Sequence, residues 1–392
     1  MILWQKDNSE IASKIGIAGD FLPAPNFELP DKSTWSSISD SVAPYFEDLD
    51  MSVINLECPL DVGDSKPRMK MAMGGSFSAS DEVLNFLSAV KTGIVGIANN
   101  HIYDYGNEGL ESTKRAVLAK EMTPIGCGRT LLDSPEVFIW EGPARTRVGF
   151  WAAARGLSEN ATRNISGVEA ATQKRGLEAL AKMNAQGVQL RIALIHAGLE
   201  HTNRPDPDDV AFLDSLATLG FDVVAAAHSH RISGYKAIAR PDGRAAFCFY
   251  GLGSLLSGVM YTPLEREGIL VVLALDARGG IAKVEARPIQ LEGAGWGAVP
   301  DPGRGDSISR RFLRCSEEIS DGSYKRLFYQ DTGKNLFRRQ FRDVQVAIRQ
   351  GGLKGLTRKL SRLRMRHLHR LIWKGLRFAR IFVAIVPRKN PI

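Results

Sequence analysis

The sequence predicts a layered α/β fold, and three observations support this prediction. Short apolar runs rich in β-branched and aromatic residues alternate with longer stretches that space apolar residues three or four positions apart. Helices between consecutive strands imply parallel pairing, because parallel strands need crossover connections. Hydrophobic residues make up 44% and charged residues 24% of the 392 residues, which is enough apolar material for a sizeable core. Disorder, collagen-like repetition and a small disulfide-stabilised fold are therefore excluded.

The expected elements follow this rhythm along the chain. Eight strands are expected near Lys14–Gly19, Met51–Leu56, Thr92–Ala98, Arg147–Ala153, Arg191–Ile195, Asp222–Ala227, Ala246–Tyr250 and Gly268–Leu275. Four helices, each with one apolar face, are expected at Asp81–Lys91, Glu108–Glu121, Val168–Asn184 and Pro207–Leu219. The Gly- and Pro-rich stretch Glu292–Gly305 is typical of a linker. We therefore expect a folded body over residues 1–291, a linker over 292–331 and a separate tail over 332–392.

The tail differs from the body in charge. Residues 332–392 carry 17 Lys and Arg and a single acid, Asp343, whereas residues 1–331 carry 34 basic and 42 acidic residues. Apolar residues recur on one side of a helical wheel, with arginines and lysines over most of the remainder. They are Leu353, Leu356, Leu360, Leu363, Leu371, Phe378 and Phe382. This pattern predicts an amphipathic helix that lies on an anionic membrane surface without crossing it.

Two other roles for the tail stay open at this point. A helix packed on the acidic body has the same pattern. Nucleic-acid binding is disfavoured, because Leu and Phe at helical spacing require an apolar partner and no base-stacking aromatics are patterned here. The four cysteines form no C-x-x-C pair, and the polar N-terminus lacks the apolar run of a signal peptide. We therefore expect a cytoplasmic protein bound peripherally to the inner face of the membrane.

Polar residues that can perform chemistry follow five of the predicted strands. Parallel α/β sheets bind ligands at these carboxyl ends. The tips are Gly19-Asp20, Asn55-Leu56-Glu57, Asn99-Asn100-His101, His196 and His228-Ser229-His230, and they hold four of the seven histidines. Each tip alone has a structural explanation: a turn cap, a surface carboxylate, a hydrogen-bonded turn or a core histidine. Together, imidazoles and carboxylates favour a site for zinc, iron or manganese.

Such a site suits the hydrolysis of a phosphoester, in which metal ions lower the pKa of water and stabilise the displacement. Two other kinds of active site have less support: a Ser-His-Asp site, because its motif is incomplete, and a phosphate-binding loop, because its motif is absent. Gly251-Leu252-Gly253-Ser254 lacks the G-x-S-x-G pattern of a nucleophile elbow. No stretch matches the phosphate-binding G-x-x-x-x-G-K-[ST] loop.

The motifs of this chain, and their order along it, resemble those of the CapA family of bacterial capsule and poly-gamma-glutamate synthesis proteins. The motifs that carry the resemblance are Gly19-Asp20, Asn55 to Leu60, Ala98 to His101 with Asp104 and Gly106, His196 to Glu200, His228 to His230 and Gly251 to Ser254. The resemblance covers residues 14–290. It implies a four-layered α/β/β/α sandwich like that of the metallophosphoesterases, with the site at the strand ends. Expected partners are a polymer precursor or phosphoester and subunits of a capsule-synthesis complex.

The resemblance also implies roles for single residues. One or two divalent ions (Mn, Fe or Zn) would be held by Asp20, Glu57, Asn100, His196, His228 and His230, with Glu57 as a bridge. His101 would orient or protonate the leaving oxygen, and Asp104 would shape its loop or hold an imidazole.

The sequence departs from the wider superfamily at one ligand. Leu22 stands two residues after Asp20, where metallophosphoesterases have histidine, so one imidazole ligand is missing. His201 is a candidate replacement, and a solvated loop histidine is the alternative. This departure favours a non-catalytic accessory or scaffold protein of a polymer-synthesis complex, whereas the Asn100-His101 pair and the histidine pair favour an enzyme.

Overall fold

The computed structural model of the protein describes residues 1–6, 9–23, 38–67, 76–157, 160–240, 242–258, 262–292, 297–298 and 302–332. The chain divides into a compact unit, Met1–Tyr324, and a second unit, Lys325–Ile392. The predicted tail lies outside the described residues except for residue 332, so its helix stays a prediction. No helix within the described residues is long and apolar enough to span a membrane.

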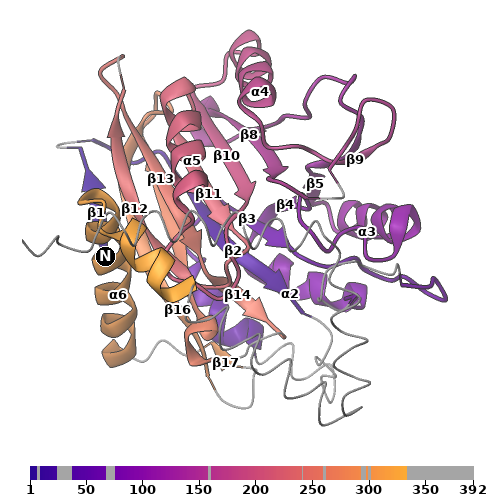
Figure 1. Ribbon diagram of the computed structural model, residues 1–392. Helices are drawn as coiled ribbons and strands as arrows, with labels where there is room; N and C mark the ends of the chain where they lie inside the picture. The colour runs from indigo at the N-terminus through magenta and orange to yellow at the C-terminus, as the bar shows by residue number, and fades with distance from the viewer. Residues whose placement is uncertain are drawn as a thin grey trace, which may run out of the picture. The chain divides into compact units, whose positions relative to one another are not determined.

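Two large sheets form the centre of the compact unit (Figure 1). In the described residues the larger sheet has nine strands in the order β1-β16-β15-β2-β3-β4-β5, with β14 paired to β2 and β17 to β16. The strands are β1 (Ile2–Gln5), β2 (Ser13–Leu22), β3 (Met51–Leu56), β4 (Thr92–Gly96), β5 (Thr123–Ile125), β14 (Ser254–Ser257), β15 (Glu267–Leu275), β16 (Ile281–Glu292) and β17 (Gly297–Ala298). The run from β2 to β5 is parallel, as predicted.

The second large sheet has six strands among the described residues, in the order β12-β13-β11-β10-β8-β7. The strands are β7 (Phe138–Glu141), β8 (Arg147–Ala154), β10 (Leu190–His196), β11 (Val223–Ala227), β12 (Ile232–Ala239) and β13 (Ala245–Leu252). Its four central strands are parallel. A small third sheet pairs β6 (Cys127–Arg129) with β9 (Gly167–Val168).

Helices cover the outer faces of both sheets, which gives the predicted α/β/β/α layers. Helices α4 (Gln173–Ala185) and α5 (Pro207–Leu219) pack on the six-stranded sheet (Figure 1). Helices α2 (Leu84–Ala89) and α3 (Gly106–Ala119) contact β4 and β5 of the other sheet. Short 3₁₀ turns are η1 (Ala43–Tyr45), η2 (Asp81–Val83), η3 (Pro143–Arg145) and η4 (Pro263–Arg266).

The core consists of two clusters of buried apolar residues, which lie between these layers. One cluster joins buried residues of both sheets, such as Ile17 and Phe249, with the helices on the larger sheet. The other fills the space between the six-stranded sheet and α4 and α5, where the rings of Trp151 and Phe221 stack 5.6 Å apart. Burial of this apolar surface at about 25 cal/mol per Å² is the main driving force for the fold.

The structure contains strands that the sequence prediction lacks, among them β1, β12 and β16, and it differs from the prediction in two expected segments. Val168, the expected start of a helix, belongs to β9, and α4 begins five residues later, after Thr172 caps it. The expected linker over 292–331 contains α6 (Pro302–Ser320), whose residues Ile308, Phe312 and Cys315 are buried. A helix with a buried apolar face is part of the folded body rather than a linker. The Gly- and Pro-rich residues around its start concealed this face in the sequence.

Candidate metal centre

The carboxyl ends of β2, β3, β10 and β11 bring polar side chains from both sheets together. In the parallel register Asp20 lies beside Asn55, so both side chains are on the same face. His196 ends β10, next to Ala227 at the end of β11, and His228 follows directly. Sequence segments separated by up to 208 residues therefore meet at one edge, where the backbone N–H of His228 donates to Asp20 Oδ2 at 2.9 Å.

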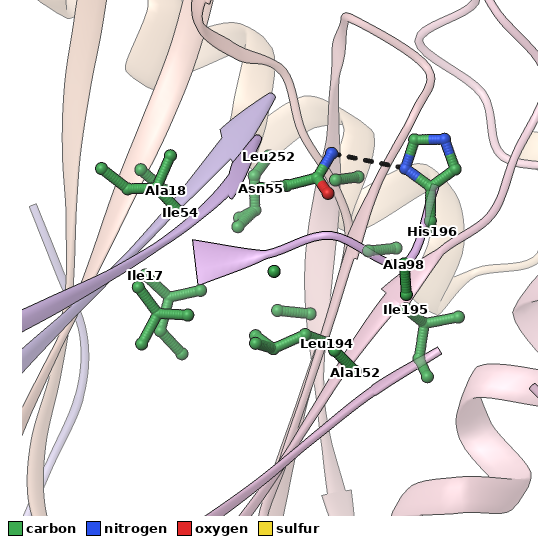
Figure 2. Close-up of a pocket in the computed structure, with 15 residues that line it drawn as sticks. Ile17, Ala18, Ile54, Asn55, Ala98, Ala152, Leu194, Ile195, His196 and Leu252 are labelled. Carbon is green, nitrogen blue, oxygen red and sulfur yellow. Dashed lines mark hydrogen bonds between the residues drawn. The ribbon is translucent and has the colours of Figure 1, made fainter. Parts of the chain in front are cut away.

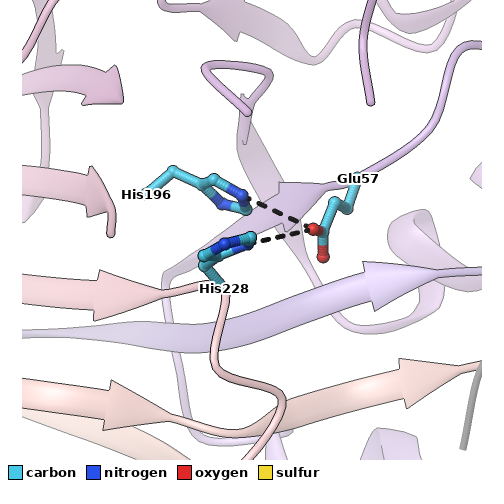
Figure 3. A group of neighbouring side chains, drawn as sticks. All are labelled: Glu57, His196 and His228. Carbon is cyan, nitrogen blue, oxygen red and sulfur yellow. Dashed lines mark ion pairs between the residues drawn. The ribbon is translucent and has the colours of Figure 1, made fainter. Parts of the chain in front are cut away.

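Glu57 is the central carboxylate of this edge. It is fully buried. Its Oε1 lies 3.4 Å from His196 Nε2 and 3.8 Å from His228 Nδ1, and Figure 3 shows both rings directed at this oxygen. Its Oε2 lies 3.8 Å from His230 Nδ1, which is also 3.2 Å from Asp20 Oδ2. Two groups of ligand atoms result, Glu57-His196-His228 and Asp20-Glu57-His230, and Glu57 belongs to both.

The predicted sixth ligand, Asn100, lies in the same place. Its Oδ1 is 2.8 Å from His196 Nε2, the nitrogen that faces Glu57. The amide of Asn55 donates to Asp20 Oδ1 at 2.7 Å and lies 3.4 Å from His196 Nδ1. Asn55 thus contacts one residue of each ligand group, Asp20 in one and His196 in the other. The six predicted ligands are therefore together in space, and their roles as ligands stay a prediction.

His101 and Asp104 form a pair in the adjacent loop. His101 Nδ1 lies 2.8 Å from Asp104 Oδ2, which also accepts the backbone N–H of Phe77 at 2.8 Å. Both side chains are buried. Because the carboxylate accepts a hydrogen bond from Nδ1, this nitrogen carries a proton, and Nε2 is the nitrogen through which His101 can act on a reactant. Asn99 supports the loop through its Oδ1, which accepts the backbone N–H groups of His101 and Ile102.

Close packing of the backbone at Gly19 and Gly253 supports the centre. A Cβ atom at Gly19 would clash with the carbonyl oxygen of Gly253, and Asp20 N donates to this same oxygen at 3.1 Å. Gly253 has a φ of 71°, in the left-handed region that favours glycine. These two glycines let the β13–β14 connection approach β2, and this contact fixes the backbone of Asp20.

Electrostatic interactions couple the charged groups of the centre. Burial alone lowers the pKa of His230, but Glu57 and Asp20 reverse this effect and raise the pKa to about 9. Burial raises the pKa of Glu200, but the imidazoles around it, His228 first and then His230, outweigh burial and lower its pKa. Negative charge in this cluster is thus stabilised by imidazoles, and a cation at His230 must displace a proton.

The residues present fit a divalent metal ion. Within the described residues, Nδ1 of His228 and Nδ1 of His230 are buried and lack a well-directed hydrogen bond. A buried polar atom without such a bond is costly unless something else occupies its lone pair. Imidazole nitrogens and carboxylate oxygens are the donor set of zinc, iron and manganese. Leu22, which stands two residues after Asp20, is a buried apolar residue of β2 and offers no ligand atom.

A small cavity lies between the sheets beneath the centre (Figure 2). Its volume is about 30 Å³, which is enough for one or two water molecules. Asn55 and His196 are the polar side chains among the described residues that line it, and the remainder of the lining is apolar. The cavity is too small for a substrate, so a reactant must approach from the outer side of the strand ends.

Sequence reasoning missed three contributors to the centre. Asn55 was named as part of a strand tip but received no role, although its spacing beside Asp20 follows from parallel register. Glu200 was named only in a motif. Glu265, on η4, is fully buried and lies 3.1 Å from His201, and no local sequence signal marks it.

Comparison with known proteins gives three findings. The family model described as bacterial capsule synthesis protein PGA_cap matches residues 14–259. The capsule biosynthesis protein CapA of Bacillus anthracis is 22% identical over 263 residues, which cover 64% of this chain and 60% of that protein. The PGA biosynthesis protein CapA of Bacillus subtilis (strain 168) is 22% identical over 280 residues, which cover 71% of this chain and 70% of that protein.

Among solved structures, this chain is similar to the 5′-nucleotidase precursor from Thermus thermophilus. The TM-score is 0.43 and the sequence identity is 12%. The matched region covers 79% of this chain and 59% of that chain.

Proposed function

Because this chain belongs to the PGA_cap family of bacterial capsule synthesis proteins, we propose that it serves capsule or cell-surface polymer biosynthesis by hydrolysing a phosphoester. One observation supports the proposed phosphoester hydrolysis. Glu57 contributes one oxygen to each of two imidazole-containing ligand groups, which is the arrangement that a pair of divalent ions needs. Bound metal ions of this kind supply Lewis-acid activation of water and of the phosphoester.

The chain's own residues divide into two sets in this proposal. Asp20, Glu57, Asn100, His196, His228 and His230 would hold the metal. His101, as an imidazolium with Nδ1 held by Asp104, would donate the proton on Nε2 to the leaving oxygen and be left neutral. Asn55 keeps Asp20 and His196 oriented, as an outer partner of metal ligands commonly does.

Metal analysis combined with a substrate screen tests the proposal. Protein purified without chelator, with the metal content of each preparation measured, is assayed on phosphomonoesters and phosphodiesters with Mn²⁺, Fe²⁺ or Zn²⁺ added. We expect turnover that needs a divalent ion and is lost in Glu57→Gln. A preparation that holds the metal but cleaves no ester of either type contradicts hydrolysis.

A second function, that of a non-catalytic accessory or scaffold protein, is favoured by Leu22. This buried leucine takes the place of the imidazole that the superfamily carries after its first aspartate. The accessory protein would use the same edge of the fold to bind polymer or a synthase. Retention of metal together with binding, without cleavage, of the polymer precursor is the expected result for this alternative.

We also propose that the tail places the protein on the cytoplasmic face of the membrane, bound to anionic lipid. Support comes from the 17 basic residues and the apolar stripe within residues 332–392. Full-length protein should co-sediment with anionic vesicles, less with neutral ones and less at high salt, because each basic residue contributes about 1 kcal/mol near the surface. Leu360→Asp with Phe378→Asp should abolish this binding. Equal sedimentation of the double variant contradicts the role of the tail.

A further inference from the structure

A second imidazole held by a carboxylate lies beside the metal-ligand cluster. His201 Nδ1 is 3.1 Å from Oε1 of Glu265. Glu265 is fully buried and closes a capping box with Thr262 at the start of η4. The side chain of His201 keeps 29% of its surface exposed, so a molecule bound at the centre can reach the ring.

The surroundings of Glu265 determine which nitrogen of His201 is presented. Oε1 of Glu265 also accepts hydrogen bonds from Arg231 Nη2 at 3.0 Å and from Thr262 Oγ1 at 3.3 Å. The guanidinium of Arg231 favours the ionised form of this carboxylate, which only accepts hydrogen bonds, so Nδ1 of His201 carries a proton and donates to Glu265. The other nitrogen, Nε2, faces Glu200, whose Oε2 lies 3.8 Å away.

The backbone places this ring at the edge of the centre. His201 N donates to the carbonyl oxygen of Ser229 at 2.9 Å, which ties its loop to the loop that carries His228 and His230. The centroids of the His201 and His230 rings are 6.2 Å apart. His201, His228 and His230 have φ values of 66°, 117° and 55°. A non-glycine residue in this region is energetically unfavourable, and such residues concentrate at functional sites.

We propose that His201 is a further substrate-contacting residue, which as an imidazolium donates a hydrogen bond from Nε2 to an oxygen of the phosphoryl group. The identity of this ligand rests on the proposed function. His201 belongs to neither ligand group, and in this proposal it acts beside the metal ions and not as a ligand. Its Nε2 lies 3.8 Å from a carboxylate oxygen of Glu200, and an imidazolium, which carries a proton on each nitrogen, can donate to Glu265 on one side and to an anion on the other.

Two substitutions at His201 separate this role from a structural one. His201→Asn keeps an amide N–H near the position of Nδ1 for Glu265 and tolerates the positive φ, but it removes Nε2. His201→Gln instead places an amide N–H near the position of Nε2. Binding of inorganic phosphate to Mn²⁺-loaded full-length protein is measured by calorimetry for both variants and the wild type, together with the manganese content.

We expect His201→Asn to weaken phosphate binding about 10- to 100-fold, the range for a hydrogen bond to a charged group, and His201→Gln to recover part of the loss. Manganese content should be unchanged in both. Equal phosphate affinity of wild type and His201→Asn overturns the proposal, as does a wild type that binds no phosphate. Loss of manganese from His201→Asn also overturns it, because His201 would then be a ligand.

Turnover measured on the same preparations separates this inference from the proposed hydrolysis. A wild type that binds phosphate through His201 but cleaves no phosphoester supports the proposed His201–phosphoryl contact and contradicts the proposed hydrolysis. If instead the wild type cleaves phosphoesters, and His201→Asn has the same phosphate affinity and turnover, the hydrolysis is supported and the His201–phosphoryl contact is contradicted.

Discussion

Two buried carboxylates of this molecule have opposite surroundings. Glu169 receives two hydrogen bonds from the guanidinium of Arg175, at 2.6 and 2.7 Å, and both side chains are almost fully buried. Glu57, which is at least as buried, faces three imidazole nitrogens at 3.4 to 3.8 Å. The first carboxylate meets a permanently charged partner in ideal geometry. The second faces imidazole nitrogens at distances longer than those within the first pair.

The difference separates a structural ion pair from a site built for a ligand. The hydrogen bonds that Arg175 donates to Glu169 raise the pKa of the Arg175 guanidinium, so the guanidinium remains charged, and they tie the residue after β9 to α4. Around Glu57, two imidazole Nδ1 atoms lack well-directed hydrogen bonds within the described part of the chain. A cation placed among them would satisfy these atoms. We therefore expect substitutions at the first pair to change stability and substitutions at the second to change metal binding or turnover.

The largest expected effect is on turnover at His101, the imidazole next to the Glu57 cluster. If the protein is an enzyme, His101→Ala should lower turnover about 10²- to 10⁴-fold and leave bound metal largely unchanged, because its proposed role is proton transfer. His228→Ala should release metal instead. Steady-state kinetics and metal analysis of both variants check this. Equal metal loss in the two variants contradicts the assigned roles.

The next largest effect is on stability at the Glu169 pair. Arg175→Met should lower the free energy of unfolding by about 3–5 kcal/mol, because it leaves a carboxylate buried without its guanidinium. Denaturant unfolding measures the loss, and Arg175→Met with Glu169→Gln should recover part of it. The metal content of the folded variant should equal that of the wild type. A loss below about 1 kcal/mol would contradict the interpretation of Glu169 and Arg175 as a pair that stabilises the fold.

The smallest effect is expected at an exposed pair. Asp48 accepts two hydrogen bonds from Arg287 at 2.7 and 2.9 Å, which hold its pKa well below the usual range, but its side chain is 42% exposed. Asp48→Asn should cost less than about 1 kcal/mol at pH 7.

Acid titration sharpens this last case. Since the pKa of Asp48 is lower in the folded state, its contribution is present above pH ~3.9 and is lost as the pH falls further. The difference in unfolding free energy between wild type and Asp48→Asn should therefore shrink below that pH. A difference that grows on acidification contradicts the assigned pairing.

The sequence predicted the interior of the fold better than its edges. The strand at Met51–Leu56 and the helix at Pro207–Leu219 have the bounds expected, because a buried parallel strand is an unbroken apolar run and Asp206-Pro207 is a strong helix start. Strand β16 was missed although Lys283, Glu285 and Arg287 alternate with its apolar residues, which is the pattern of a half-buried strand. Pro288 within this run argues against a strand, and the antiparallel pairing with β15 identifies it.

In the candidate site, too, some residues could be predicted from the sequence and others could not. Asp20, Glu57 and His196 could be predicted to converge because each follows a buried parallel strand, and strand ends share one edge of a sheet. Glu265 could not, since it lies on a 3₁₀ turn 64 residues after His201 and its role arises from tertiary packing. The division of the ligands into two groups around Glu57 also depends on side-chain directions that spacing does not encode.

Metal stoichiometry of Glu57→Gln tests the central claim most directly. Wild type and variant are loaded with Mn²⁺, passed through a desalting column and analysed for metal, with Arg175→Met as the control. Because Glu57 belongs to both ligand groups, the variant should lose metal from the whole centre, whereas the wild type and the control should retain at least one equivalent. Metal retention by Glu57→Gln equal to that of the wild type would contradict the account.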